Sequence, residues 1–135
     1  MNPIFLSIED ILEIHSDQIR RYGGTMVIRD TLLLQSAIAQ PCAMFSGKFL
    51  YHDLFEMASA YLFHLVMNHP FLDGNKRTGG AAALVFLFLN GVKPGINEDS
   101  FADMVLSVAR GEIKKPEIAL FFRKACTGFE QTDLS

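Results

Sequence analysis

The segment from Gly79 to Leu89, GGAAALVFLFL, restricts the possible folds of this chain more than any other segment. It carries no polar side chain on any side over about three helical turns. It is too short to span a bilayer, which requires about 20 apolar residues. A helix without a polar face is buried inside a protein. The segment therefore predicts a buried central helix that begins near Gly74 or Asn75 and ends at Asn90-Gly91.

Apolar residues recur at helical spacing in five further segments, each bounded by capping residues, glycine or proline. Residues 42–52, CAMFSGKFLYH, lack this spacing and favour a loop or a small β-hairpin. The sequence therefore predicts an all-α single domain of about six helices over residues 1–135. The helices around the central one are expected from Ser7 to Gly23, after Asp30 to before Pro41, from Asp53 to His69, from Asn97 to Arg110, and from Pro116 to Cys126.

Composition excludes several functional classes. Hydrophobic residues make up 50% of the chain and charged residues 20%, which is enough apolar material for a packed core. The net charge of -3 argues against a broad nucleic-acid-binding surface. Cys42 and Cys126 form no disulfide framework, and the N-terminal residues lack the basic region of a signal peptide. We therefore expect a cytoplasmic protein with reduced thiols and with neither a nucleic-acid nor a membrane partner.

The stretch HPFLDGNKRTGG, residues 69–80, concentrates reactive side chains where the central helix begins. The first turn of a helix has free backbone N–H groups and the positive end of the helix dipole, so it attracts anions. Gly74 allows a ligand to approach the backbone closely. Lys76 and Arg77 would destabilise a helix start by up to about 1 kcal/mol unless an anion lies between them. The pattern predicts a site for a di- or triphosphate.

Two further side chains give this stretch catalytic potential. Asp73 is a single carboxylate beside a phosphate site, which is a common arrangement for Mg²⁺ because this ion takes its other ligands from phosphate oxygens and water. His69 lies on the other side of the loop, where a neutral imidazole could accept a proton from a hydroxyl that attacks a phosphate. Taken together, the residues favour phosphate chemistry with His69 as general base.

A purely structural interpretation exists for each residue alone. Asp73-Gly74 is a common turn pair, and Asp73 could serve only as a helix cap. Lys76 and Arg77 could be solvated surface cations, and His69 could be a packed loop residue before a proline. The functional interpretation depends on their joint occurrence at one helix junction. His15, on the apolar face of the first predicted helix, is expected to be a packed histidine rather than a ligand.

The stretch HPFLDGNKRTG resembles the signature of the Fic/Doc (Fido) superfamily, HxFx(D/E)(G/A)N(G/K)R, and every position of that signature is met. Further segments resemble successive blocks of the Doc, or death-on-curing, branch and cover nearly the whole chain. The resemblance implies the Fido fold for residues 1–135. The similar blocks are IEDILEIHSDQIRRYGG, RDTLLLQSAIAQP, NHPFLDGNKRTGGAAALVFLFLNG and LSVARGE.

The resemblance also implies a role for each residue of the signature. His69 corresponds to the catalytic general base, and Phe71 corresponds to a core anchor that fixes the loop without taking part in the chemistry. Asp73 corresponds to the acidic position that holds Mg²⁺ through the phosphates of ATP. The residues that correspond to the nucleotide and phosphate site are Asp73, Gly74, Asn75, Lys76 and Arg77.

The chain departs from the Fic pattern at two positions. Enzymes of the family that transfer AMP have glycine where this chain has Lys76, and a second arginine where it has Gly80. The Doc branch shares both departures, and it is associated with ATP bound in the reverse sense and with transfer of the γ-phosphate. A lysine at position 76 would crowd the pocket that glycine leaves open. The loss of the second arginine would remove a clamp on the far phosphates.

The expected function is that of a Doc-like toxin that transfers the γ-phosphate of Mg-ATP to a Ser or Thr hydroxyl of a protein, for which the resemblance implies a translation elongation factor. The chain lacks the (S/T)xxxE(G/N) pattern of self-inhibitory helices, so the resemblance implies a separate antitoxin whose C-terminal segment occupies a groove. Apolar residues near the first helix or within residues 42–52 are candidates for this groove. Residues 42–52 are also a candidate for a flap that docks the target. AMP transfer and a catalytically silent interaction module are the alternatives.

Overall fold

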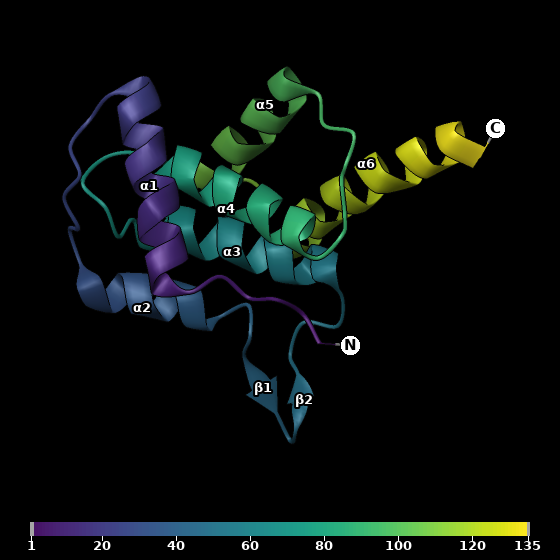
Figure 1. The fold of residues 1–135 in the computed structure, drawn as a ribbon, viewed down its shortest axis with the longest axis horizontal. Coiled ribbons are helices and arrows are strands. Elements are labelled where there is room, and N and C mark those ends of the chain that lie inside the picture. Colours follow the sequence, from purple (N-terminus) through teal and green to yellow (C-terminus); the bar gives the residue numbers. More distant parts are fainter. Residues whose placement is uncertain (1, 135) are drawn as a thin grey trace.

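The computed structural model describes residues 2–134 of the chain, and it describes side chains as far as Cys126. Within this part the chain forms six α-helices and one antiparallel hairpin, as predicted, and the helices surround one hydrophobic core (Figure 1). The elements in chain order are α1 (Ile8–Tyr22), α2 (Thr31–Ala39), β1 (Met44–Phe45), β2 (Lys48–Phe49), α3 (Leu54–Asn68), α4 (Asn75–Leu89), α5 (Glu98–Ala109) and α6 (Lys115–Leu134).

Polar N-caps fix the start of four helices, as the sequence predicts. Ser7 and Asp10 form a capping box, in which Asp10 N–H donates to Ser7 Oγ at 3.2 Å and Ser7 N–H donates to Asp10 Oδ2 at 2.8 Å. Asp30, Asp53 and Asn97 each accept a backbone N–H at the start of α2, α3 and α5. The last helix starts one residue before Pro116 and extends beyond the predicted end at Cys126. No helix in the described range has the length and apolar character needed to cross a membrane.

The central position of α4 is confirmed, because α4 packs against α3, α1 and α5. The close approach of α3 to α4 requires glycine at position 79. A Cβ atom there would lie 2.9 Å from Cγ2 of Val66 and 3.2 Å from the carbonyl oxygen of Leu62, a backbone atom that cannot move away easily. Gly79 at the start of the apolar segment therefore allows the two helices to touch at the backbone level.

The prediction that α4 is buried on all sides is wrong. Ala82, Phe86 and Leu87 are fully buried, but Phe88 is 60% exposed and Leu89 is 44% exposed. The reason is that α1 and α5 flank the outer side of α4 without covering it. An apolar helix face therefore remains open between them, formed by Ala81, Leu84, Val85, Phe88 and Leu89, and we call it the open face of α4.

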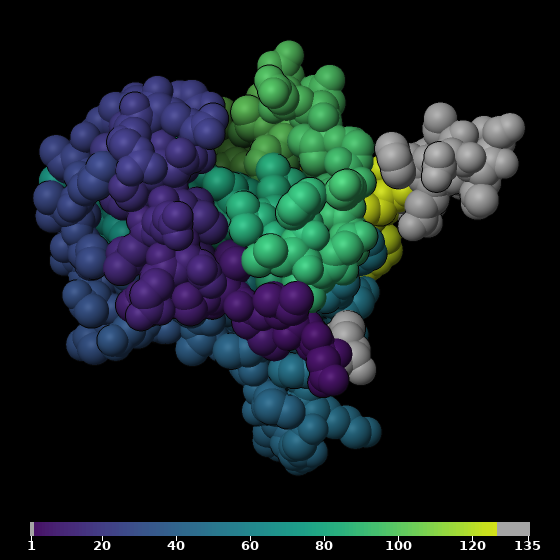
Figure 2. Space-filling model, in the orientation of Figure 1, coloured from purple at the N-terminus to yellow at the C-terminus, as the bar shows by residue number. Residues whose placement is uncertain are grey.

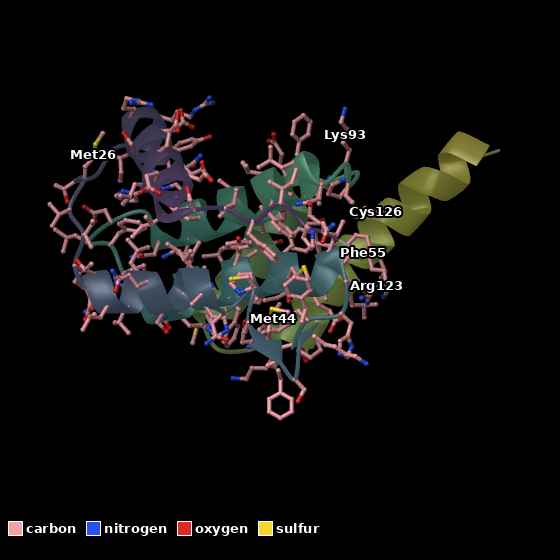
Figure 3. All side chains as sticks on the ribbon, turned by 60° about the horizontal axis from the view of Figure 1, so that its bottom comes forward. Met26, Met44, Phe55, Lys93, Arg123 and Cys126 are labelled. Carbon is pink, nitrogen blue, oxygen red and sulfur yellow. The ribbon has the colours of Figure 1, made fainter. Side chains whose placement is uncertain are left out.

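The hairpin of β1 and β2 projects from the body of the protein beside the N-terminal end of α3 (Figures 1 and 2). Phe45 at its tip is 76% exposed. His69 follows the opposite end of α3, and a helix of this length spans about 22 Å. In Figure 3, Met44 in the hairpin and Met26 in the connection from α1 to α2 lie in different parts of the molecule. The hairpin thus exists as predicted, but it does not border His69.

A polar junction ties α6 to α3 and to the segment after the hairpin. The ammonium group of Lys115 donates to Oη of Tyr51 at 2.8 Å and contacts Nε2 of His64 at 2.9 Å. Because an ammonium group can only donate, His64 must accept through an unprotonated Nε2. Burial first, and then the charge of Lys115, lower the pKa of His64 to about 4 from its ordinary value of 6.5. The fold therefore requires a neutral imidazole at this junction.

We expect His64 to make stability depend on pH between about 6.5 and 4. Its folded-state pKa lies below the unfolded value, so the unfolded chain binds the proton first and stability falls as the pH drops through this window. Because the ring is only half-buried, the loss should be about 1–2 kcal/mol rather than the full value of the shift. Urea denaturation at pH 7 and pH 4.5 measures it. The variant His64→Gln accepts the Lys115 bond without titrating, so its free energy of unfolding should fall less between pH 7 and pH 4.5. An equal fall in the two proteins would contradict the assignment.

Candidate active site

The loop between α3 and α4 is a tight turn with a left-handed residue at each end. His69 caps α3 with φ 51 and ψ 54, and Gly74 precedes α4 with φ 82 and ψ 18. A positive φ is ordinary for glycine but uncommon for other residues, although histidine tolerates it better than most. The loop thus reverses the chain within a few residues. It brings the C-terminal end of α3 and the N-terminal end of α4 into one site.

The interior of the loop is closed by Asn75 and Phe71. The side chain of Asn75 accepts the Phe71 N–H at 3.0 Å and donates to the Phe71 carbonyl at 2.9 Å. Both residues are buried, and Phe71 is fully so. The side-chain amide of Asn75 is thus already engaged in closing the loop. Its predicted contribution to a phosphate site would have to come from its backbone N–H in the first turn of α4.

The connection between α1 and α2 runs antiparallel to the loop and holds its outer edge. Leu72 N–H donates to the carbonyl of Val27 at 2.9 Å. The backbone N–H groups of Arg29 and Asp30 both donate to the carbonyl of Pro70, at 2.7 and 3.0 Å. These bonds fix the path of the loop from outside the signature. The segment that borders the loop is therefore this connection, and not the hairpin of residues 42–52.

Arg29 stabilises the end of α3 from the same connection. Its Nε donates to the carbonyl of His69 at 2.7 Å, and its Nη2 donates to the carbonyl of Asn68 at 3.1 Å. These carbonyls belong to a helix end that has no further turn to bond them, and a cation is favoured there by the helix dipole. Within the described residues the imidazole of His69 makes no hydrogen bond, and it is exposed. The backbone of His69 is thus fixed while its ring remains accessible.

Thr25 holds the carboxylate of Asp73. Both the backbone N–H and the hydroxyl of Thr25 donate to Asp73 Oδ2 at 3.0 Å. These two bonds, with the nearby charges of Arg77 and His15, lower the pKa of Asp73 below its ordinary value. The carboxyl group is therefore ionised at neutral pH and held in one orientation. An ionised, oriented carboxylate suits a position that holds a divalent cation.

The start of α4 is left open to an anion. Gly74 provides no side-chain cap, so the first backbone N–H groups of α4 have no such partner. Lys76 is exposed beside them. Arg77 is partly buried, donates to the carbonyl of Gly23 at 3.1 Å, and lies 5.4 Å from the ring centroid of Tyr22. The cationic end of α4 is thus assembled with the help of the C-terminal end of α1.

The sequence alone did not indicate three of these contacts. Thr25 and Arg29 lie in an irregular connection without helical spacing, so no periodicity pointed to them. His15 is buried as predicted, at 3% exposure, but its Nε2 also contacts the carbonyl oxygen of Asp73 at 2.8 Å. All three residues act on the loop across long stretches of sequence. Only the folded arrangement shows them beside the signature.

The comparisons with known proteins agree with this geometry. The model of the Fic/DOC family matches residues 5–87. The chain belongs to this family. Toxin Doc of Mycolicibacterium smegmatis is 38% identical over 117 residues, which cover 85% of this chain and 88% of that protein. Protein kinase doc of Escherichia phage P1 is 33% identical over 119 residues, which cover 88% of this chain and 93% of that protein. Both relatives belong with the Doc branch, as the resemblance implied.

The structure brings most of the Fic/DOC signature residues to the start of α4 but places them in different surroundings. Asp73, Gly74, Lys76 and Arg77 lie together at the cationic helix end, while Phe71 and the Asn75 amide point into the core. His69 lies at the opposite end of the loop with an exposed ring. The roles inferred from the family therefore remain predictions for each residue.

We expect Thr25→Val to raise the pKa of the Asp73 carboxyl group toward its ordinary value of 3.8, because the variant removes the hydroxyl donor and keeps the backbone donor. The titration of the Asp73 side-chain carbon by NMR measures this. Thr25→Ser keeps a hydroxyl and should leave the pKa low. A value in Thr25→Val equal to that of the unaltered protein would show that the hydroxyl bond does not govern this carboxylate.

Proposed function

We propose that this protein is a Doc-type toxin enzyme that transfers the γ-phosphate of ATP to a Ser or Thr hydroxyl of a protein. The observation that carries the proposal is the loop from His69 to Asn75, where an accessible imidazole and an ionised carboxylate flank an uncapped helix start. The relatives named Toxin Doc and Protein kinase doc, which align over most of the chain, support the same function.

The phosphates of ATP would bind at the start of α4. The free backbone N–H groups of the first turn and the helix dipole favour a polyphosphate there. Lys76 and Arg77 supply full positive charges beside these groups, and the bond from Arg77 to Gly23 holds its guanidinium at this end of the helix. Phosphoryl transfer depends mainly on alignment and charge neutralisation, and the helix start would contribute to both.

His69 would act as the general base. The target hydroxyl oxygen attacks the γ-phosphorus, its proton passes to the imidazole of His69, and the bond from the γ-phosphorus to the bridging oxygen breaks to release ADP. Proton acceptance by a positioned side chain contributes about 10²–10⁴-fold to rate. The clamp of Arg29 on the His69 carbonyl would keep the ring at a fixed position relative to the bound phosphate.

The residues at the loop fit a Mg²⁺ ion that is shared with the nucleotide. Asp73 is ionised and oriented by Thr25. In the part of the chain that the structure describes, no group of three or more His, Cys, Asp or Glu side chains forms a complete metal site, so phosphate oxygens and water would supply the remaining ligands. When bound, Mg²⁺ would neutralise charge on the phosphate oxygens, and Asp73 would fix its position.

The packing of Gly80 supports γ-phosphate transfer over AMP transfer. Gly80 is buried, and a Cβ atom at this position would lie 3.1 Å from Cε2 of Phe101 in α5. An arginine, which AMP-transferring members of the family have at this position, would require the ring of Phe101 to shift. Glycine at this position fits the packing of α5 on α4 and provides no second phosphate clamp. AMP transfer is the second candidate, because the general base and the anion site would serve either reaction.

A catalytically silent module is less well supported. The bonds from Thr25 to Asp73 and from Arg29 to the His69 carbonyl maintain a charged, accessible loop at the protein surface. The charged and exposed side chains of this loop do not contribute to packing, so a module used only for interaction gains nothing from them. For the protein target, the Doc branch points to the elongation factor that delivers aminoacyl-tRNA.

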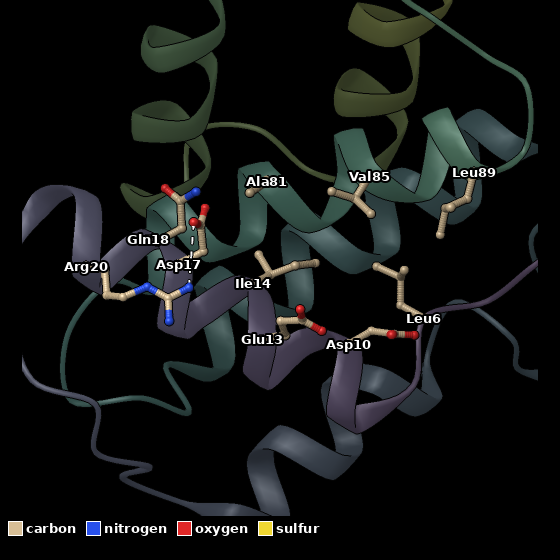
Figure 4. A pocket seen from close by; sticks show the side chains of 10 residues that line it. All are labelled: Leu6, Asp10, Glu13, Ile14, Asp17, Gln18, Arg20, Ala81, Val85 and Leu89. Atoms are coloured by element: carbon tan, nitrogen blue, oxygen red, sulfur yellow. Dashed lines mark ion pairs between the residues drawn. The ribbon is translucent and has the colours of Figure 1, made fainter.

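The open face of α4 is the best candidate for the antitoxin groove. Hollows of about 380, 430 and 560 Å³ lie along it, and Figure 4 shows the first, between α1 and α4. Three carboxylates of α1, on Asp10, Glu13 and Asp17, line that hollow together with Arg20, whose guanidinium pairs with Asp17 at 3.9 Å. The largest hollow reaches Lys76 and Arg77. An amphipathic segment with basic residues toward α1 would thus extend along α4 to the phosphate site.

Transfer of label from ATP tests the reaction. We expect a protein in a cell extract to become labelled from γ-labelled ATP and not from α-labelled ATP, and we expect His69→Ala to reduce the rate by about 10²–10⁴-fold. Label from the α-position would establish AMP transfer instead. No label from either position, with no effect of the protein or of His69→Ala on cell growth, would support the silent module.

Substitution on the open face tests the antitoxin groove. Phe88→Asp should leave toxicity in cells unchanged and should weaken rescue by the co-expressed antitoxin, with at least about a tenfold loss of affinity. Phe45→Asp at the hairpin tip is the matched control, because both rings are exposed, at 60% and 76%. Equal rescue of the two variants, or loss of rescue only in Phe45→Asp, would place the antitoxin elsewhere.

A further inference from the structure

His15 is a buried side chain of α1 that contacts the signature loop although it lies outside the signature. Its ring stacks on that of Phe71, with a centroid distance of 3.7 Å and an angle of 7° between the planes. Its Nε2 lies 2.8 Å from the carbonyl oxygen of Asp73. A carbonyl can only accept, so Nε2 carries the proton and donates. His15 therefore holds the peptide bond between Asp73 and Gly74 by its oxygen.

The direction of this bond determines where the Gly74 N–H points. The described residues contain no cis peptide bond, and in a trans peptide the C=O and N–H groups point in opposite directions. His15 is buried and holds the Asp73 carbonyl on its own side of the loop. The Gly74 N–H therefore points away from His15 and from the protein interior. Within the described residues no hydrogen-bond acceptor takes this N–H. It is therefore available to a ligand at the start of α4.

The backbone at this position has the form of an anion-binding concavity. Gly74 is left-handed, with φ 82 and ψ 18, and Asn75 begins the right-handed helix. Successive N–H groups of such a pair converge on one point and bind anions. The Gly74 N–H would thus join the N–H groups of the first turn of α4 around the same phosphate.

A peptide bond beside glycine needs to be held in this orientation. Glycine adopts positive and negative φ almost equally well, so the peptide between Asp73 and Gly74 could rotate at small cost. Rotation would turn the Asp73 carbonyl oxygen, with its negative partial charge, toward the bound phosphate. A side chain at position 74 cannot supply the constraint, because there is little room for one: a Cβ atom there would lie 3.2 Å from Cδ1 of Ile19. The constraint must come from another residue, and His15 supplies it.

We infer that His15 is a positioning residue for the phosphate site: its Nε2–H fixes the peptide between Asp73 and Gly74 so that the Gly74 N–H faces a bound polyphosphate. This inference rests on the proposed function, because it requires that polyphosphate binds at the start of α4. It assigns a role in ligand binding to a residue of α1 whose packing alone would explain its burial.

Two variants separate the hydrogen bond of His15 from its packing. His15→Phe keeps a ring that can stack on Phe71 and removes the donor to Asp73. His15→Gln removes the ring and keeps an N–H donor at a similar reach. If His15 only packs, His15→Phe should bind ligands like the unaltered protein and His15→Gln should be impaired. If His15 orients the peptide, the order is reversed.

We expect His15→Phe to bind inorganic tripolyphosphate about ten- to a hundredfold more weakly, the effect of losing one hydrogen bond to a charged ligand. His15→Gln should bind within about threefold of the unaltered protein. Isothermal titration calorimetry measures both, and thermal unfolding shows whether each variant is folded. The KM for ATP should rise in parallel in His15→Phe, with a smaller change in kcat.

The outcomes distinguish this inference from the proposed function. Failure of the unaltered protein to bind tripolyphosphate or Mg-ATP would overturn the phosphate site itself. Binding by the unaltered protein together with equally tight binding by folded His15→Phe would overturn only the role of His15. NMR on the unaltered protein gives a test that needs no variant. The amide signal of Gly74 should shift on addition of tripolyphosphate, and an unchanged Gly74 signal beside shifting Lys76 and Arg77 signals would contradict the inference.

Discussion

The meeting of two opposite helix ends in one short loop is the constraint on which the site depends. The C-terminal end of α3 carries a partial negative charge, and the N-terminal end of α4 carries a partial positive charge. The protein satisfies the first internally, through the guanidinium of Arg29 on the carbonyls of Asn68 and His69. It leaves the second without a side-chain cap at Gly74. This asymmetry makes one end of the loop rigid and the other receptive to an anion.

Three separate parts of the chain maintain that asymmetry. The connection between α1 and α2 supplies Thr25 and Arg29, helix α1 supplies His15, and the signature supplies the loop. The buried bonds of Asn75 to Phe71 close the interior of the loop. The residues proposed to face a ligand are thus few. Most of the contacts described above serve to keep the backbone in a shape that glycine at position 74 would otherwise leave free.

The helices could be predicted because their signals are local. Capping residues and helical spacing located the start of four helices, and the proline after His69 located the end of α3. Partial exposure of α4 could not be predicted, because it depends on how far α1 and α5 cover it rather than on its own residues. The contacts of Thr25, Arg29 and His15 with the loop could not be predicted from the sequence either. They join residues far apart in sequence, and two of them involve backbone carbonyls that every residue type shares.

The packing of Phe101 on Gly80 couples α5 to the start of α4. The family model matches residues 5–87, which include the loop and the elements that hold it, whereas α5 follows the matched residues. Phe101 reaches back from α5 and limits the room beside Gly80. A substitution at position 101 can therefore change the space next to the helix start without altering any residue of the loop.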